Sequence, residues 1–278
     1  MKEKGIILIT SGHPYYGKLA ASLAASILAH EFIPITLYVH GNSDLQLTTD
    51  ERLLFDSVKP LQDKYIMNGS KVLPFMPKVC LNKLSPYKNT IYLDVDIAWN
   101  PKRSVNELFK SLNGKQFVTI CEGYNERINK HYQTWANIDD IRKVYNITDI
   151  PQTRTEFIYF EKCELTDAIF SKALQVFKNP MVKFTQYSNH IPDELAFNIA
   201  LAVNKHHLDV YCPVYWAYLH KGQQWLNYYA YSMGGAITTT EQKRIYNGLI
   251  HNAYSKLGMK MSYQFRDKKY FNKKLQMI

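Results

Sequence analysis

Apolar and polar positions along this chain follow a pattern that predicts buried strands separated by helices. The continuous apolar run over residues 5–10 predicts a strand that is buried on both faces. Leucine and alanine at helical spacing over residues 15–30 predict a helix, and the apolar run over residues 35–39 predicts a second strand. A strand–helix–strand opening favours an α/β fold with a doubly wound sheet. In such sheets, ligands bind beyond the carboxyl ends of the strands.

The rest of the chain continues this alternation without an internal repeat or a low-complexity linker. We expect helices over residues 48–58, 78–84, 106–112, 166–177, 193–203 and 240–257, and strands over residues 90–93, 117–121, 156–160 and 208–219. Residues 123–150 are polar and aromatic without a sustained period, and we interpret them as an insertion that lines a cleft. The pattern therefore predicts one domain, with Gly258 as the stop of the last helix.

Two aspartates stand where the strand predicted over residues 90–93 ends. Asp94 and Asp96 are separated by Val95, and residues two apart on a strand point to the same side. Both carboxylates can therefore face one point, where a divalent cation would relieve their mutual repulsion. Mg²⁺ and Mn²⁺ prefer such oxygen ligands. A solvated turn that carries two acids is an equally good interpretation of this short D-x-D motif alone.

Composition narrows the classes of partner and the cellular context. Basic residues outnumber acidic ones, which gives the 278-residue chain a formal net charge of +10, and this charge favours anionic partners such as nucleotides or nucleic acid. Four widely spaced cysteines form no C-x-x-C motif, which argues against a zinc site and a disulfide scaffold. No apolar stretch reaches the length of a membrane span. We expect a soluble, cytoplasmic protein.

Four segments resemble a known enzyme family in their residues and in their order. The sequence KVCLNKLSPYKNTIYLDVD, which begins at Lys78, is similar to the K-L-x-x-x-x-L-x-x-Y segment before the D-x-D of family 8 glycosyltransferases, the glycogenin-like and galactosyltransferase-like enzymes. Residues 16–27 resemble that family's Y-x-x-x-A-x-x-L-x-x-S-L helix, residues 193–198 its D-Q-x-x-L-N segment, and residues 220–225 a shortened H-x-x-G-x-x-K-P-W. The family's N-x-G strand is missing, and residues 155–158 read T-E-F-I there instead.

The resemblance implies a GT-A fold, which is a Rossmann-like mixed sheet flanked by helices, in a single domain. We expect this domain over residues 1–258, with a nucleotide-binding half over about 1–122 and an acceptor half over about 123–258, followed by a basic tail over residues 259–278. The implied reaction transfers a sugar from a nucleotide-sugar donor, a UDP-sugar, with Mn²⁺ or Mg²⁺ and with retention of configuration. The acceptor stays open among a glycan, a protein and a polyanion such as modified DNA.

The resemblance also implies roles for individual residues. Asp94 and Asp96 would hold the metal, with His220 as the third ligand and His251 as its rival. Asp193 would be a cleft carboxylate near the sugar. The nucleotide would contact a further set of residues, namely Thr10, Ser11, Tyr15, Tyr16, Lys78, Val95 and Lys221. The resemblance favours the functional roles of Asp94, Asp96 and Lys78, whereas ordinary structural roles explain the other residues about equally well.

Two other function classes remain open at this point. A sugar-phosphate nucleotidyltransferase also uses paired aspartates on a Rossmann-like sheet, although it needs a glycine-rich phosphate loop after the first strand, and residues 11–15 here read S-G-H-P-Y. A basic nucleic-acid-binding protein would explain the charge and the aromatic content, but the sequence contains no recognised nucleic-acid-binding motif.

Overall fold

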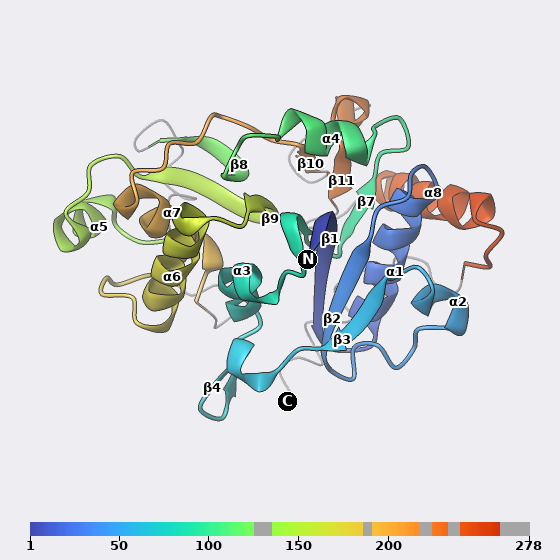
Figure 1. Ribbon diagram of the computed structural model, residues 1–278, viewed down its shortest axis with the longest axis horizontal. Helices are drawn as coiled ribbons and strands as arrows, with labels where there is room; N and C mark the ends of the chain where they lie inside the picture. The colour runs from blue at the N-terminus through green and yellow to red at the C-terminus, as the bar shows by residue number, and fades with distance from the viewer. Residues whose placement is uncertain (125–134, 186–190, 217–223, 233–239, 262–278) are drawn as a thin grey trace.

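A six-stranded sheet in the order β3-β2-β1-β6-β9-β8 lies at the centre of the molecule in the computed structural model (Figure 1). The structure describes residues 1–124, 135–185, 191–216, 224–232 and 240–261. The strands of this sheet are β1 (Lys2–Gly12), β2 (Ile35–Gly41), β3 (Ser57–Pro60), β6 (Tyr87–Leu93), β8 (Phe117–Tyr124) and β9 (Pro151–Glu161). The first four in spatial order are parallel, whereas β9 pairs antiparallel with both β6 and β8. The predicted α/β fold with a mixed sheet is confirmed.

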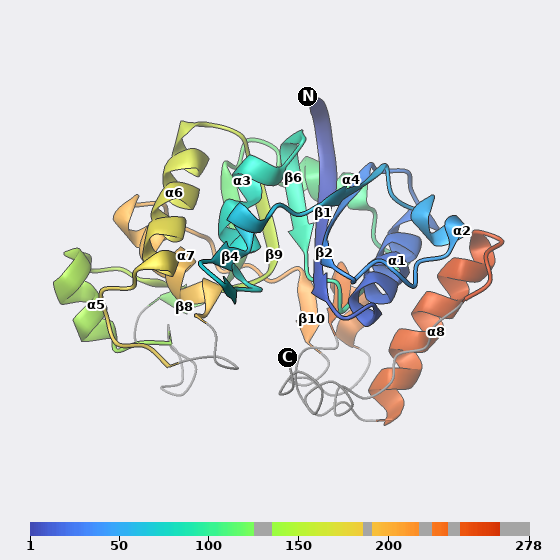
Figure 2. The same ribbon diagram turned by 90° about the horizontal axis from the view of Figure 1, so that it is seen from below.

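Helices cover both faces of this sheet. They are α1 (Tyr15–Leu28), α2 (Thr49–Arg52), α3 (Leu81–Leu84), α4 (Val105–Ser111), α5 (Ile138–Tyr145), α6 (Glu164–Lys178), α7 (Asp193–Val203) and α8 (Thr240–Lys256), together with the short 3₁₀ helices η1 (Asp63–Tyr65), η2 (Met76–Cys80) and η4 (Gln224–Asn227). Helices α1 and α8 lie side by side on one side of the sheet, and α6 and α7 lie on the other (Figures 1 and 2).

Alternation along the strands divides the core into two clusters. Ile6 and Leu8 of β1 pack into the cluster that contains α1 and α8, whereas Ile7 packs into the cluster that contains η2, α6 and α7. In the same way Leu93 of β6 faces α1, and Tyr92 faces η2 and α7. This period of two is what a sheet covered on both faces requires. The same alternation determines which helices the residues after the end of β6 can contact.

Small sheets complete the fold outside the central one. Strands β7 (Ile97–Trp99), β10 (Val214–Trp216) and β11 (Ala230–Ser232) form a three-stranded sheet in the order β10-β11-β7. It continues the chain directly after Asp96, so that the aspartate pair lies between two sheets. A separate hairpin consists of β4 (Met67–Asn68) and β5 (Lys71–Val72).

Several predicted elements differ in extent from the observed ones. Of the helix expected over residues 48–58, only the single turn of α2 forms, and a capping box between Thr48 and Glu51 stabilises its start. The last two residues of the expected helix, Ser57 and Val58, belong to the edge strand β3. Of the strand expected over residues 208–219, β10 begins only after Pro213, and residues 217–219 lie outside the described residues. Residues 123–150 contain α5, which the absence of a sustained period did not predict.

Other expectations agree with the structure. Helix α8 ends before Gly258, which has a left-handed φ of 66° that favours glycine. All four cysteines are free. In the described part of the chain, no helix combines the length and the apolar character needed to cross a membrane. Most of the tail expected over residues 259–278 lies outside the described residues.

Candidate functional site

The candidate site lies where β6 ends between β1 and β9. The pairing of Ile7 with Tyr92 places the carboxyl end of β1 beside the residues that follow β6. Asp94 is the first residue after β6, and its backbone N–H donates to the carbonyl of Glu156 at 2.9 Å. Because Asp94 follows Tyr92 by two residues, it lies on the same face, and the Tyr92 hydroxyl donates to Asp94 Oδ1 at 2.6 Å. Val95 packs into the cluster on the opposite face, as the alternation predicts.

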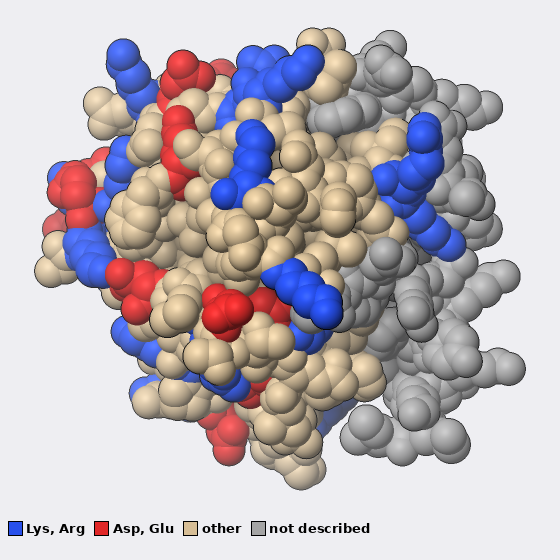
Figure 3. Space-filling view, turned by 90° about the vertical axis from the view of Figure 1, so that its right-hand side faces the viewer, with Lys and Arg blue, Asp and Glu red and all other residues tan. Residues whose placement is uncertain are grey.

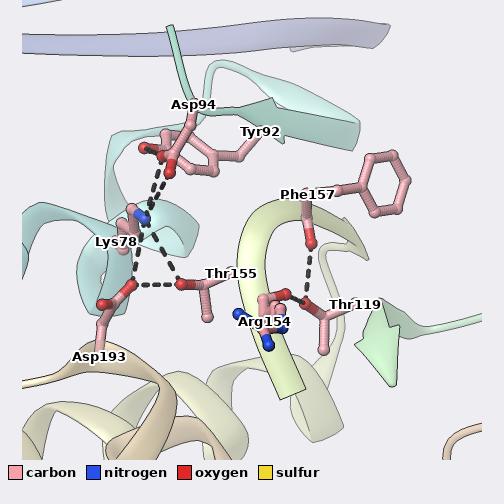
Figure 4. Close-up of polar contacts among 8 residues, drawn as sticks. All are labelled: Lys78, Tyr92, Asp94, Thr119, Arg154, Thr155, Phe157 and Asp193. Carbon is pink, nitrogen blue, oxygen red and sulfur yellow. Dashed lines mark hydrogen bonds and ion pairs between the residues drawn. The ribbon is translucent and has the colours of Figure 1, made fainter. Parts of the chain in front are cut away.

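Lys78 links Asp94 to the beginning of α7. Its Nζ lies 3.0 Å from Asp94 Oδ1 and 3.3 Å from Asp193 Oδ2, and the side chain is 10% exposed (Figure 4). The rings of Phe75 and Tyr92 flank the ammonium at 5.9 and 5.6 Å from their centroids. Although burial alone would lower the pKa of Lys78, Asp193 and Asp94 raise it well above its usual value. Lys78 therefore stays charged and holds two carboxylates together.

A wide bulge in β9 supplies the remaining wall of the site. Thr119 pairs with Ile158 while the next residue of β8 pairs with Arg154, so that residues 155–157 bulge out of the ladder. The Thr119 hydroxyl closes the bulge, because it lies 2.8 Å from the carbonyl oxygens of both Arg154 and Phe157 (Figure 4).

The bulge directs its first side chain toward the lysine. The Thr155 hydroxyl donates to Asp193 Oδ2 at 2.5 Å and accepts from Lys78 Nζ at 3.4 Å. The backbone carbonyl of the next residue, Glu156, receives the Asp94 N–H. One irregular segment of β9 thus contacts the groups that come from η2, from the end of β6 and from α7.

Carboxyl groups outnumber cations around Lys78. Burial, followed by the nearby Asp94 carboxylate, raises the pKa of Glu156 to about 7. Burial and the adjacent Asp193 raise the pKa of Glu194 to about 8. Burial also raises the pKa of Asp94, with Asp96 adding to the shift and Lys78 opposing it. The site therefore crowds acidic groups together, and burial disfavours the ionised form of several of them, although the chain as a whole is basic.

One of these carboxyl groups has an oxygen that accepts no hydrogen bond from the described residues. Glu156 Oε2 is buried and has no hydrogen-bond partner among the described residues. The guanidinium of Arg154 lies nearby and lowers the pKa of Glu156, but it forms an ion pair with Glu122 at 2.9 Å.

The residues expected around the nucleoside occupy the carboxyl end of β1 and the start of α1. The Thr10 side chain is buried and its hydroxyl lies 2.9 Å from the Ser43 hydroxyl, so the side chain joins β1 to the loop after β2. Ser11 is half-buried at the end of β1. Tyr15 is buried, and Tyr16 is half-buried with its ring packed edge-on against Tyr15 at 5.9 Å between centroids. The nucleotide-binding role of these four residues, and of Val95, stays a prediction.

The proposed metal ligands are only partly described. Asp96 lies close enough to Asp94 to raise its pKa, which suits a pair that shares a cation. Among the described residues, no group of three histidine, cysteine or acidic side chains is arranged to hold a metal ion. His251 is exposed on α8, and its role as the alternative third ligand stays a prediction. His220 and Lys221 lie outside the described residues.

Three side chains at the site were not among the predicted ones. Tyr92 and Thr155 hydrogen-bond directly to the aspartates, and Glu156 lies on the bulge of β9. Two signals were available for Glu156, namely an acid in an otherwise apolar strand and its place in the T-E-F-I segment that stands where the related family has N-x-G. The bulge itself depends on pairing with β8, which a strand pattern does not reveal.

Comparison with solved structures identifies the fold. The chain matches the apo structure of WbbM, a bifunctional glycosyltransferase, with a TM-score of 0.58 and 12% identity over 94% of this chain and 52% of that one. It also matches galactosyltransferase LgtC in complex with donor and acceptor sugar analogues, with a TM-score of 0.54 and 11% identity over 97% of this chain and 99% of that one. An active-site mutant of LgtC gives a TM-score of 0.54 and 11% identity over 89% of this chain and 95% of that one.

The likeness to these solved structures concerns the fold and not the activity. At such identities, the likeness establishes the GT-A fold alone. The chain spans about half the length of WbbM, since it covers 52% of that chain. No protein-family model and no curated protein sequence matches the chain.

Proposed function

We propose that this protein is a metal-dependent glycosyltransferase that transfers a sugar from a UDP-sugar to an acceptor. The observation that carries the proposal is the position of Lys78, whose ammonium joins Asp94 at the end of β6 to Asp193 at the start of α7. The GT-A fold offers its ligand site at this edge of the sheet. The sequence resemblance assigns Lys78, Asp94 and Asp193 to the same site, and the three come from separate segments of the chain.

Sugar transfer leaves a nucleoside diphosphate, whose developing charge must be stabilised. Asp94 and Asp96 would hold a divalent cation, Mn²⁺ or Mg²⁺, which supplies Lewis-acid stabilisation of that charge when bound. His220, outside the described residues, is the proposed third ligand. Lys78 would orient the donor through its ammonium, since its pKa keeps it charged at neutral pH. Retention of configuration is part of the proposal by resemblance alone.

Thermal unfolding with UDP, in the presence and in the absence of Mn²⁺, tests the proposal directly. We expect UDP to raise the melting temperature only when Mn²⁺ is present, because ligands that bind the folded state stabilise it. Asp94→Asn and Asp96→Asn should each abolish this shift, since either change removes a charged ligand. Asp139→Asn is a matched control, because Asp139 is exposed on α5 and forms only a surface ion pair with Arg142. UDP stabilisation that survives both site changes would exclude the metal-dependent mechanism.

Hydrolysis of donors provides the second test, because it requires no knowledge of the acceptor. A panel of UDP-, GDP- and TDP-sugars with Mn²⁺ should reveal slow release of one nucleoside diphosphate. A preparation that instead forms pyrophosphate from a nucleoside triphosphate and a sugar phosphate would be a nucleotidyltransferase.

One face of the molecule shows no basic stripe among its described residues. On the face seen in Figure 3, the lysine and arginine side chains that are coloured are spread across the surface, and acidic side chains lie among them. A basic groove or stripe is the usual electrostatic feature of a nucleic-acid-binding surface.

A further inference from the structure

The ammonium of Lys78 contacts both oxygens of Asp94. Its Nζ lies 3.0 Å from Asp94 Oδ1 and 3.1 Å from Asp94 Oδ2 (Figure 4). Oδ1 also accepts a hydrogen bond from the Tyr92 hydroxyl at 2.6 Å. A carboxylate has about four lone-pair sites on its two oxygens, so Tyr92 and Lys78 together use most of those that Asp94 offers. Any further ligand of Asp94 must therefore lie next to the ammonium.

Lys78 also has partners that do not depend on Asp94. Its Nζ lies 3.3 Å from Asp193 Oδ2 and donates to the Thr155 hydroxyl at 3.4 Å. These two residues come from α7 and from the bulge of β9, and the lysine side chain is only 10% exposed. When another cation draws on the Asp94 carboxylate, the ammonium therefore keeps its place between Asp193 and Thr155, close to that cation.

The carboxylates of Asp94 and Asp96 fit a divalent cation by their chemistry, because Mn²⁺ and Mg²⁺ prefer such oxygen ligands. The close contact of Asp94 with an ammonium shows that this carboxylate attracts positive charge. Lys78 would oppose a divalent cation at the same carboxylate, since like charges repel strongly in a largely buried site. A diphosphate bound beside them carries negative charge that offsets the charge of both cations.

We propose that Lys78 makes the binding of a divalent metal ion at Asp94 depend on the nucleotide. Without a nucleotide, the ammonium competes with the metal ion for the Asp94 carboxylate. A nucleoside diphosphate removes this competition, because its phosphates give both cations a shared anionic partner. Metal ion and nucleotide thereby raise each other's affinity by the same factor, since coupling between two binding events is reciprocal. This coupling rests on the proposed function, because it concerns the metal ion and the donor of that reaction.

Removal of the ammonium should strengthen Mn²⁺ binding in the absence of a nucleotide. The electron paramagnetic resonance signal of unbound Mn²⁺ gives the Kd for the unmodified protein and for Lys78→Met, at about pH 8, where carboxyl groups are normally ionised. We expect the Kd of the variant to be at least about fivefold lower, which is the lower end of the usual coupling between sites. If Lys78 merely held Asp94 in place for the metal ion, the variant would bind Mn²⁺ more weakly. An equal or higher Kd would therefore overturn the inference.

The double variant K78M/D193N tests the same point with a balanced charge. It removes one positive and one negative side chain, so the net charge of the protein does not change, and it leaves no second carboxylate opposite Asp94 without a cation. Because Lys78 contacts both oxygens of Asp94, the double variant should also bind Mn²⁺ more tightly than the unmodified protein. A Kd that is not lower would contradict competition at Asp94.

Two controls locate the effect. Lys88→Met removes a lysine that is 46% exposed and forms only surface ion pairs with Glu3 and Glu161, so it should not change the Kd for Mn²⁺. The variant K78M/D94N should lose the gain in affinity, because it lacks the carboxylate for which the two cations compete. A gain that persists in K78M/D94N would place the bound Mn²⁺ elsewhere and would overturn the inference.

The unmodified protein provides a measurement that does not depend on the folding of any variant. Ligands that bind the folded state raise the melting temperature, so Mn²⁺ alone should raise it much less than Mn²⁺ with UDP. Equal shifts would contradict the proposed role of Lys78, because Mn²⁺ would then bind without help from the nucleotide. Absence of a shift with Mn²⁺ and UDP together would instead overturn the proposed function, and with it this inference.

Discussion

Replacing Lys78 with methionine would leave Asp94 and Asp193 together in a largely buried site without their shared cation. The ammonium lies 3.0 and 3.3 Å from the two carboxylates, and each contact is worth about 5 kcal/mol at an effective dielectric constant of about 20. Desolvation of the lysine offsets much of that gain. Since removal of one partner from a buried ion pair costs about 3–5 kcal/mol, we expect Lys78→Met to lower the free energy of unfolding by a similar amount.

The loss of stability in Lys78→Met should also depend on pH, and the direction of this dependence follows from the protonation of Asp94. Lys78 lowers the pKa of Asp94, which burial raises above its usual value, so the variant's folded state binds a proton more tightly than its unfolded state does. Protonation of Asp94 then relieves the loss at low pH, and the deficit relative to the unmodified protein grows as the pH rises from about 4 to 8.

Urea unfolding at a series of pH values, in the presence of a chelator, measures both effects. Lys88→Met is the control, because Lys88 is 46% exposed and forms only long surface ion pairs; its effect should stay within about 0.5 kcal/mol. The double variant K78M/D193N should recover part of the stability, because it removes one of the two opposing carboxylates. A deficit for Lys78→Met that is equal to that of the control, or independent of pH, would refute this account.

Three further predictions concern backbone packing, the β9 bulge and the acidic cluster. Gly17→Ala should lower the free energy of unfolding by about 1–3 kcal/mol, because a Cβ there would lie 2.1 Å from the Ser43 carbonyl oxygen. Gly248→Ala, with nothing within 4 Å of its Cβ in α8, should raise it by about 0.5–1 kcal/mol, and urea unfolding would contradict both if the order were reversed. Thr119→Val removes the hydroxyl that closes the bulge and should cost about 1–3 kcal/mol, whereas Thr119→Ser should keep most of the stability; equal losses would show that the hydroxyl does not hold the bulge. For Glu194, whose pKa is raised from its usual 4.5 to about 8, the folded state holds a proton that the unfolded state has released, so stability falls between those pH values by up to about 1.4 kcal/mol per pH unit. Glu194→Gln should flatten that slope in metal-free buffer, and an unchanged slope would contradict the assignment.

The central part of the fold could be predicted because its signals are local. The apolar runs of β1, β2 and β6 and the helical spacing in α1 and α7 are properties of short windows. Strand β3 shows where this approach fails. Its four residues, Ser57–Pro60, follow a capped helical turn closely, and they form a strand because they pair with β2. Whether such edge strands form depends on pairing with segments that are distant in the sequence, and the same holds for β10 and β11. A short window of sequence does not include the pairing partner.

Only those residues of the candidate site that a local sequence pattern distinguishes could be predicted. Asp94 could be recognised because it ends an apolar strand, and Lys78 because of the motif that it opens. Thr155 and Glu156 reach the site through a bulge, and the bulge exists because β8 and β9 change register. The role of Thr10 toward the nucleotide stays a prediction, but the sequence did not reveal that its hydroxyl lies 2.9 Å from that of Ser43. Which partner a buried hydroxyl finds depends on the loop packed above it, and the strand pattern does not reveal this.

The buried glutamates should lower the stability of the protein at high pH. The raised pKa values of Glu156 and Glu194 mean that their ionised forms destabilise the folded state above about pH 7. Asp193 and Glu194 are the first residues of α7, where the helix dipole favours negative charge, but that contribution is smaller than the burial of several acids. The double variant E156Q/E194Q should therefore be more stable than the unmodified protein at high pH. Urea unfolding in metal-free buffer measures this difference, and a double variant that is less stable than the unmodified protein at high pH would point to loss of packing instead of charge.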